Sequence, residues 1–348
     1  MKKIVFAGDF YYDYASVAED IKEIGKWIES EEGGMILNLE GSFGLQSPID
    51  KRGPNLHMHE AATDAMKMLN VKTVCLANNH MMDYGSEGLE CTLNALNENQ
   101  IMYIGAGQNL ENAVKPKILK INDKIIGILN FGWNIEETVY ASDFESGCAP
   151  KEKTIILSSI KKIRREVDYL IVCLHWGFEY NRLPLPCDID LAHSIIDFGV
   201  DLIIGHHAHC VQPFEIYKGK KIYYSLGNFY FGSVRDEYNK VFKDEFIENQ
   251  SDYGILVELD CNSFETAEKM VYYDKKTKQS RLVDCDACIL EDISNIDYKS
   301  WAYCKKVYRR RNNINPILTN NVLLNKYKLR ILFLYYKLKA IIKKVIRR

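Results

Sequence analysis

The sequence lacks a hydrophobic run long enough to cross a membrane, since none approaches the ~20 apolar residues of a spanning helix. Only four apolar residues follow Lys2 and Lys3 before Gly8, so we expect no signal peptide. The ten cysteines suggest no disulfide framework, and the lone C-x-x-C, Cys285 to Cys288, excludes a zinc ribbon. Repeats and low-complexity blocks are also missing. These absences predict a soluble protein of a reducing compartment, the cytoplasm.

Acidic residues are absent from the last part of the chain. No Asp or Glu follows Asp297, whereas 15 of the 45 Lys and Arg residues lie between Tyr298 and Arg348. The first 297 residues hold the other 30 basic residues and all 47 acidic ones, a formal charge of −17 against +15. This asymmetry is typical of an acidic body with a basic appendage. We therefore predict a domain over residues 1–290 and a basic helical tail over 291–348.

The basic tail contains a helical pattern over residues 324–348. Apolar residues recur every three or four positions, at Leu324, Tyr327, Ile331, Leu334, Leu338, Ile341 and Val345. Three interpretations stay open: contact with an anionic membrane surface, pairing with another helix, or packing on the acidic body. The first would make the protein peripheral on the inner face of the membrane. Nucleic acid is disfavoured as a partner, because aromatic residues are not interleaved as stacking platforms.

Most of the sequence alternates between strand-like and helix-like segments. Apolar residues have helical spacing at 16–29, 61–69, 86–96, 155–167 and 188–198. Turn signals between apolar runs predict hairpins at 118–131 and 214–225, and further strands are expected at 252–273. The mixture favours an α/β (α+β) architecture, with a mixed sheet or two stacked sheets covered by helices.

Six short apolar runs end in residues that suit metal binding or catalysis. Each run resembles a buried strand, and ligand sites of layered α/β proteins lie beyond the carboxyl ends of such strands. The residues at these ends are Asp9, Asn38, Glu40, Asn79, His80, His175, His206, His207, His209 and Asn228. One sheet edge could gather them into a metal-dependent hydrolytic centre.

The segment from His206 to His209 holds three of the eight histidines, directly after a strand and Gly205. Alternate residues of an extended segment point the same way, so His207 and His209 can address one ion or two neighbouring ions. Imidazole suits zinc, iron, manganese or nickel. The strand and glycine before these histidines favour metal binding over a surface loop with incidental histidines.

The other candidate residues each have a structural alternative. Asn79 offers a neutral oxygen ligand and His80 a general acid, although the pair is also typical of a turn before a helix. His175 is either a ligand or a hydrogen-bonded core residue. Asp9 and Glu40 can bridge two cations, although a turn cap and a solvated acid also fit. Their shared position at strand ends favours the metal site.

Together these segments resemble the CapA family of poly-gamma-glutamate capsule synthesis proteins, within the calcineurin-like metallophosphoesterase superfamily. The resemblance covers roughly residues 3–232, and the set of motifs is highly specific. The matching segments are Gly8-Asp9, Asn38-Leu39-Glu40-Gly41, Leu76-Ala77-Asn78-Asn79-His80, Asp83-Tyr84-Gly85, Leu174-His175-Trp176-Gly177, Glu179-Tyr180, Gly205-His206-His207-Ala208-His209 and Tyr224-Ser225-Leu226-Gly227-Asn228-Phe229.

The resemblance implies a four-layer α-β-β-α sandwich, metallophosphatase-like, with a metal site at one sheet edge. It implies that His80 donates a proton and that Glu40 is a bridging carboxylate. The further metal ligands that it implies are Asp9, Asn79, His175, His207 and His209. We predict that substrate is bound by Asn38, Glu179, His206 and Asn228, with a loop-anchoring or solvated Glu179 as the alternative.

Two positions depart from the superfamily pattern. Tyr11 stands where a His usually lies two residues after Asp9, and Met81 replaces the usual acid after His80. The first departure leaves open whether the centre holds one ion or two. By the resemblance we expect a divalent transition metal, Mn, Fe or Zn.

Two functional hypotheses follow from the resemblance. In the first, the chain is a metal-dependent hydrolase of capsule synthesis that cleaves a phosphoester or related bond, with poly-gamma-glutamate or a related anionic polymer as the product of the pathway. In the second, it is a non-catalytic polymer-binding subunit of a capsule synthase or export complex. Tyr11 favours the second hypothesis and the His cluster opposes it. Both imply capsule-synthesis membrane proteins as candidate partners.

Overall fold

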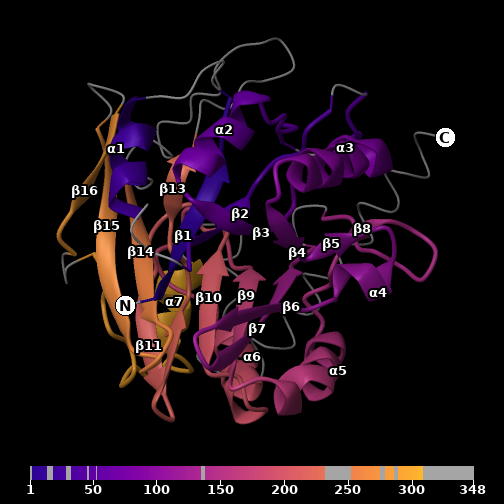
Figure 1. Ribbon diagram of the computed structural model, residues 1–348. Coiled ribbons are helices and arrows are strands. Elements are labelled where there is room, and N and C mark those ends of the chain that lie inside the picture. Colours follow the sequence, from indigo (N-terminus) through magenta and orange to yellow (C-terminus); the bar gives the residue numbers. More distant parts are fainter. Residues whose placement is uncertain are drawn as a thin grey trace.

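Two β-sheets stack against each other and helices cover their outer faces (Figure 1). The computed structural model describes residues 2–13, 19–28, 33–44, 47–51, 53–134, 138–231, 252–274, 279–285 and 289–308. This arrangement is the four-layer α-β-β-α sandwich, of class α/β (α+β), that the family resemblance implies.

The first sheet has the strand order β16-β15-β14-β1-β2-β3-β4, and β13 also pairs with β1. Its strands are β1 (Lys3–Tyr11), β2 (Met35–Leu39), β3 (Val71–Cys75), β4 (Met102–Ile104), β13 (Asn228–Phe231), β14 (Tyr253–Asp260), β15 (Thr266–Asp274) and β16 (Gln279–Val283). The pairs β1–β2, β2–β3 and β1–β13 are parallel. The carboxyl ends of β1, β2 and β3 therefore lie at one edge of the sheet.

The second sheet has the strand order β11-β12-β10-β9-β7-β6. Its strands are β6 (Lys117–Ile121), β7 (Lys124–Gly132), β9 (Tyr169–His175), β10 (Leu202–His206), β11 (Phe214–Tyr217) and β12 (Lys220–Tyr223). The pairs β7–β9 and β9–β10 are parallel, whereas β6–β7 and β11–β12 are the two predicted hairpins. A small antiparallel pair joins β5 (Ala106–Gly107) to β8 (Gly147–Cys148).

The five predicted helical segments all contain helices. They are α1 (Glu19–Ile28), α2 (Ala61–Met68), α3 (Gly85–Glu98), α5 (Lys153–Ile163) and α6 (Pro186–Asp197). The segment predicted at 155–167 changes after Ile163 to a short 3-10 turn, Arg164–Glu166. One further helix, α4 (Leu110–Ala113), was not predicted, and α7 (Trp301–Tyr308) lies within the tail that was predicted to be helical over 291–348.

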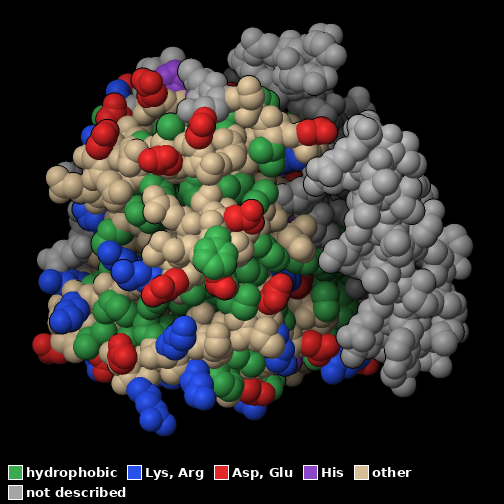
Figure 2. Space-filling view, turned by 90° about the vertical axis from the view of Figure 1, so that its right-hand side faces the viewer, with side chains coloured by type: hydrophobic (Ala, Val, Ile, Leu, Met, Phe, Trp, Pro, Cys, Tyr) green, Lys and Arg blue, Asp and Glu red, His purple; other side chains and the backbone are tan. Residues whose placement is uncertain are grey.

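The surface carries charges of both signs. On the face shown in Figure 2, Asp and Glu side chains are interspersed with Lys and Arg. Exposed ion pairs include Lys218–Asp197 at 2.5 Å and Lys299–Asp190 at 3.4 Å. The acidic excess of residues 1–297 is therefore not gathered into one patch on this face.

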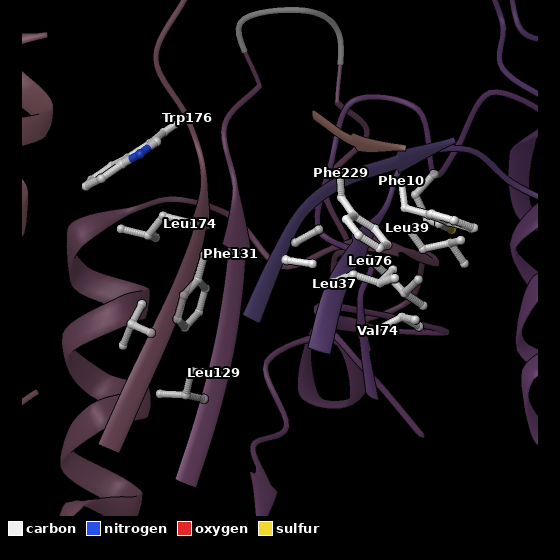
Figure 3. Packing of buried hydrophobic residues seen from close by; sticks show 14 of the residues in the cluster. Phe10, Leu37, Leu39, Val74, Leu76, Leu129, Phe131, Leu174, Trp176 and Phe229 are labelled. Carbon is white, nitrogen blue, oxygen red and sulfur yellow. The ribbon is translucent and has the colours of Figure 1, made fainter. Parts of the chain in front are cut away.

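The core follows from the alternation of side chains along the strands. In β1, Ile4 and Phe6 belong to the cluster between the two sheets, together with Ile171 of β9. Val5 and Ala7 point the other way, into the cluster that includes the helix residues. Figure 3 shows part of this second cluster on strands of both sheets. Each large aliphatic side chain fully buried in this way stabilises the fold by ~1.5–3 kcal/mol.

The described part of the C-terminal segment packs against the body. Beside β11, Ile293 N donates a hydrogen bond of 2.9 Å to Phe214 O. In α7, Tyr303 and Val307 are buried in the core. The boundary between residues 290 and 291 stays a prediction. The predicted membrane-binding helix at 324–348 lies outside the described residues, and no described helix has the length and hydropathy to span a membrane.

Candidate metal centre

The structure gathers donor side chains from both sheets at one edge of the sandwich. Asp9 lies in β1, Glu40 directly follows β2, and β9 ends at His175. The loop after β10 carries His207 and His209. The described residues form three groups of candidate donors, and within each group the donor atoms lie within 4.8 Å of one another. These groups are Glu40 with His175 and His207, Asp9 with Glu40 and His209, and Glu179 with His207 and His209.

Glu40 lies at the middle of the cluster and is fully buried. Its Oε1 atom is 3.5 Å from His209 Nε2, 3.8 Å from His175 Nε2 and 4.0 Å from His80 Nε2. Hydrogen bonds of N–H to oxygen span about 2.7–3.2 Å, so these separations are too long for direct bonding. They suit ligands that share a cation between them.

Asn38 holds the two carboxylates in place. Its Nδ2 donates to Asp9 Oδ1 at 2.9 Å and, more weakly, to Glu40 Oε2 at 3.3 Å. The other carboxylate oxygen of Asp9, Oδ2, accepts a hydrogen bond of 3.1 Å from His207 N. Asn38 is fully buried and positions the ligands, and its predicted contact with substrate stays a prediction.

Asn228, on β13, orients His209. The Asn228 Oδ1 atom lies 2.9 Å from His209 Nδ1, and an amide oxygen can only accept. The proton of a neutral His209 is therefore on Nδ1, and Nε2 directs its lone pair toward Glu40. A metal-bound histidine commonly donates its second N–H in this way, which fixes the tautomer and the ring.

Asn79 and His175 approach each other across the two sheets. Asn79 Oδ1 is 2.8 Å from His175 Nε2. Burial lowers the pKa of His175 well below its usual value, and the neighbouring His207 lowers that pKa further. The imidazole is thus neutral, which is the form that binds metal ions. The donor set of imidazoles, carboxylates and an amide oxygen fits a divalent transition metal.

His80 is held by a carboxylate behind it. Its Nδ1 donates to Asp83 Oδ2 at 2.7 Å, while its Nε2 faces Glu40. Lys51 pairs with Asp83 through the other carboxylate oxygen and donates to Asn79 O at 3.1 Å. Burial lowers the pKa of His80, and the charge of Lys51 lowers that pKa further.

Sequence reasoning did not assign a role to Lys51 or Asp83. The position of Asp83, three residues after His80 in a turn, is a signal that could have revealed it. Lys51 lies in a loop without periodicity, 29 positions from His80, and carries no such signal. Its side chain is only 2% exposed, and this burial is visible only in the structure.

The end of β10 and the loop after it have a backbone that restricts which residues fit. A Cβ atom at Gly205 would lie 1.9 Å from Tyr224 O, so only glycine fits there. His207 and His209 have φ angles of 90° and 51°. Backbone in this left-handed region costs of the order of 1–3 kcal/mol for non-glycine residues and tends to occur at functional sites.

Two of the sequence candidates, His206 and Glu179, and the departure at Tyr11 lie at the margin of the donor cluster or point away from it. The His206 side chain turns away, because its Nε2 lies 3.2 Å from Ala7 O in β1. Tyr11 is 6% exposed and packs with its ring 5.4 Å from that of Phe231, which in turn contacts His209. Glu179 is partly buried and joins the group of His207 and His209. The roles predicted for His206 and Glu179 toward substrate stay predictions.

Comparisons with known proteins agree with the resemblance found in the sequence. CapA of Bacillus anthracis, a capsule biosynthesis protein, is 34% identical over 187 residues, 52% of this chain and 46% of the relative. The Bacillus subtilis PGA biosynthesis protein CapA is 32% identical over 197 residues, 56% of this chain and 52% of the relative. The chain thus spans about half the length of these curated relatives.

A similar crystal structure is that of a phosphatase from Mycoplasma pneumoniae. The TM-score is 0.48 and the identity 15%, over 89% of this chain and 98% of the other. In the sequence comparison, a family model described as bacterial capsule synthesis protein PGA_cap matches residues 2–233. The match covers more than half of the chain and every donor residue described above, and the chain belongs to this family.

Proposed function

We propose that the chain is a metal-dependent hydrolase that acts in the synthesis of an anionic capsule polymer. The observation that carries the proposal is the arrangement around Glu40 Oε1, which lies 3.5–4.0 Å from three imidazole Nε2 atoms. Amide and carboxylate partners hold these side chains at separations that the ligands of a shared cation adopt. A binding site for a divalent cation explains this spacing.

The residues present fit a divalent Mn, Fe or Zn ion. Glu40, His175 and His207, with Asn79, would hold one ion, and Asp9, Glu40 and His209 a second. Such ions polarise a phosphoryl oxygen and lower the pKa of water. The shared Glu40 would offset the repulsion between two cations.

The side chains around this centre would handle the proton of the leaving group. Asp83 accepts from His80 Nδ1, which fixes the ring and leaves Nε2 directed at the cluster. His80 would pass a proton from Nε2 to the departing oxygen in its doubly protonated form, which the Asp83 carboxylate favours. Lys51 pairs with Asp83 and donates to the backbone of Asn79. It would thereby fix the ligand Asn79 and the proton donor His80 relative to each other.

The proposed bond is a phosphoester or a related bond of an intermediate in polymer synthesis. The names of the relatives support a role beside the machinery that makes poly-gamma-glutamate, whose membrane proteins would be the partners. The formal charge of −17 over residues 1–297 would repel a polyanion, and cations in the centre would offset this charge locally.

The second candidate is a non-catalytic polymer-binding subunit. Tyr11 supports it, since an aromatic residue packed on Phe231 lies where the superfamily pattern has a ligand. A binding subunit would hold an ion as a structural element, and would not depend on His80 for any turnover.

The test is elemental analysis of the purified full chain, followed by hydrolysis of an aryl phosphate with the metal found. We expect at least one bound equivalent of metal, and we expect His80→Gln to lose most activity while it keeps the metal. General acid–base residues typically contribute about 10²–10⁴-fold in rate. His193→Gln is the matched control, because His193 bonds to Glu215 outside the donor cluster. Metal-replete protein with turnover that His80→Gln leaves unchanged would favour the binding subunit.

A further inference from the structure

Glu179, which the sequence analysis assigns to substrate, belongs to a third group of candidate metal donors. Its carboxylate lies within 4.8 Å of donor atoms of His207 and His209. His207 also belongs to the group of Glu40 and His175, and His209 to that of Asp9 and Glu40. Glu179 is thus placed next to one imidazole from each of the two proposed ion sites.

The loop that carries Glu179 is fixed on both sides of this residue. Before it, the ring of Phe178 stacks 5.9 Å from that of Trp133. After it, Tyr180 N donates a hydrogen bond of 2.7 Å to Ala208 O, which lies between the two histidines. The backbone of Glu179 is therefore tied to the loop that presents His207 and His209.

Two further hydrogen bonds hold the residues after Glu179, and one of them reaches α7. Gln212 Nε2 donates to Asn181 O at 2.6 Å, and Asn181 Nδ2 donates to Val307 O in α7 at 3.0 Å. Both side chains are buried. A loop held by buried hydrogen bonds on two sides presents its carboxylate in a defined place, as a metal ligand requires.

The geometry points to Glu179 as a metal ligand, completing the centre on the side of His209. This inference rests on the proposed function. The site of Asp9, Glu40 and His209 has three donors, and Tyr11 stands where the superfamily pattern supplies a His. A carboxylate at Glu179 supplies a further oxygen donor and offsets part of the charge of a second cation. Oxygen donors of this type suit Mn²⁺.

The test is titration of metal-free full-length protein with Mn²⁺ by calorimetry, comparing wild type with Glu179→Gln. Glutamine keeps the size of the side chain and removes its charge, so a purely packing role predicts no change. We expect the affinity for Mn²⁺ to fall roughly tenfold or more, or the stoichiometry to drop by one ion. The Co²⁺-loaded protein should also change its visible absorption spectrum, because the ligand set changes.

The matched control is Glu98→Gln, the same substitution at an exposed residue of α3. This variant should bind Mn²⁺ as wild type does, and the metal-free melting temperatures of all three proteins should agree. Unchanged Mn²⁺ affinity and an unchanged Co²⁺ spectrum in Glu179→Gln would overturn the inference while leaving the proposed function intact. Wild type that binds no divalent metal would instead overturn the proposed function, and the inference with it.

Discussion

Replacing Lys151 by Met should destabilise the protein strongly and in a pH-dependent manner. Lys151 Nζ lies 2.6 Å from Asp188 Oδ1, and the two side chains are only 7% and 3% exposed. The ammonium group also lies 4.2 Å from the centre of the Trp133 ring. Methionine keeps most of the aliphatic stem, so the substitution removes the charge and little of the packing.

Two contributions set the size of the expected loss in the free energy of unfolding. Removing one partner of a buried ion pair costs about 3–5 kcal/mol, because the other charge remains buried and uncompensated. The lost cation–π contact adds about 0.5–2 kcal/mol. Protonation of the remaining carboxyl limits the loss, so we expect the free energy of unfolding to fall by about 3 kcal/mol at pH 8.

The sign of the pH dependence follows from Asp188. Burial raises its pKa above the usual value of 3.8 even though Lys151 acts to lower it. Without Lys151 the pKa should rise further. For an acid whose pKa is higher in the folded state, the cost of folding appears as the pH rises above the unfolded pKa. The loss in Lys151→Met should therefore be smaller at pH 5 than at pH 8.

Urea unfolding of metal-free protein, followed by circular dichroism at both pH values, measures this effect. Lys218→Met is the control, since Lys218 pairs with Asp197 on the surface at 63% and 44% exposure, and we expect no measurable loss there. The double variant Lys151→Met/Asp188→Asn should recover part of the stability, because no buried charge remains. A loss below about 1 kcal/mol at pH 8, or an equal loss at both pH values, would refute the reasoning.

Two further predictions concern the metal centre. Asn38→Ala should weaken Mn²⁺ binding by about 10–100-fold in calorimetry, since the amide that positions Asp9 and Glu40 is lost; binding as tight as in wild type would contradict the positioning role. Gly205→Ala should lower both the melting temperature and the metal content, because the added Cβ would lie 1.9 Å from Tyr224 O. An alanine variant with normal melting temperature and metal content would show that the end of β10 can shift.

The elements of this fold could largely be predicted, because their signals are local. The apolar spacing at 61–69 and 86–96 corresponds to α2 and α3, and Lys218 and Gly219 form the turn between β11 and β12. The strand ends that carry Asp9 and His175 were predictable for the same reason, because the apolar run and the polar residue after it are neighbours in the sequence.

Contacts between distant segments were not predictable in this way. The chain between Asp9 and Asn228 gives no local sign that β13 pairs with β1. The same holds for Lys51, whose partner Asp83 is 32 positions away. Sequence alternation also places His206 opposite His207, yet only the structure identifies Ala7 O as its partner.

The contacts of His206 bear on how a centre divided between two sheets keeps its geometry. Ala7 belongs to the first sheet and His206 to the second, so their hydrogen bond links the sheets beside the donors. Asn130 of β7 makes a second link, since its Oδ1 accepts from Ala77 N at 2.8 Å, next to the loop with Asn79. Both links are buried, where a lost hydrogen bond costs about 1–3 kcal/mol. Hydrogen bonds within the chain therefore link the two halves of the donor set.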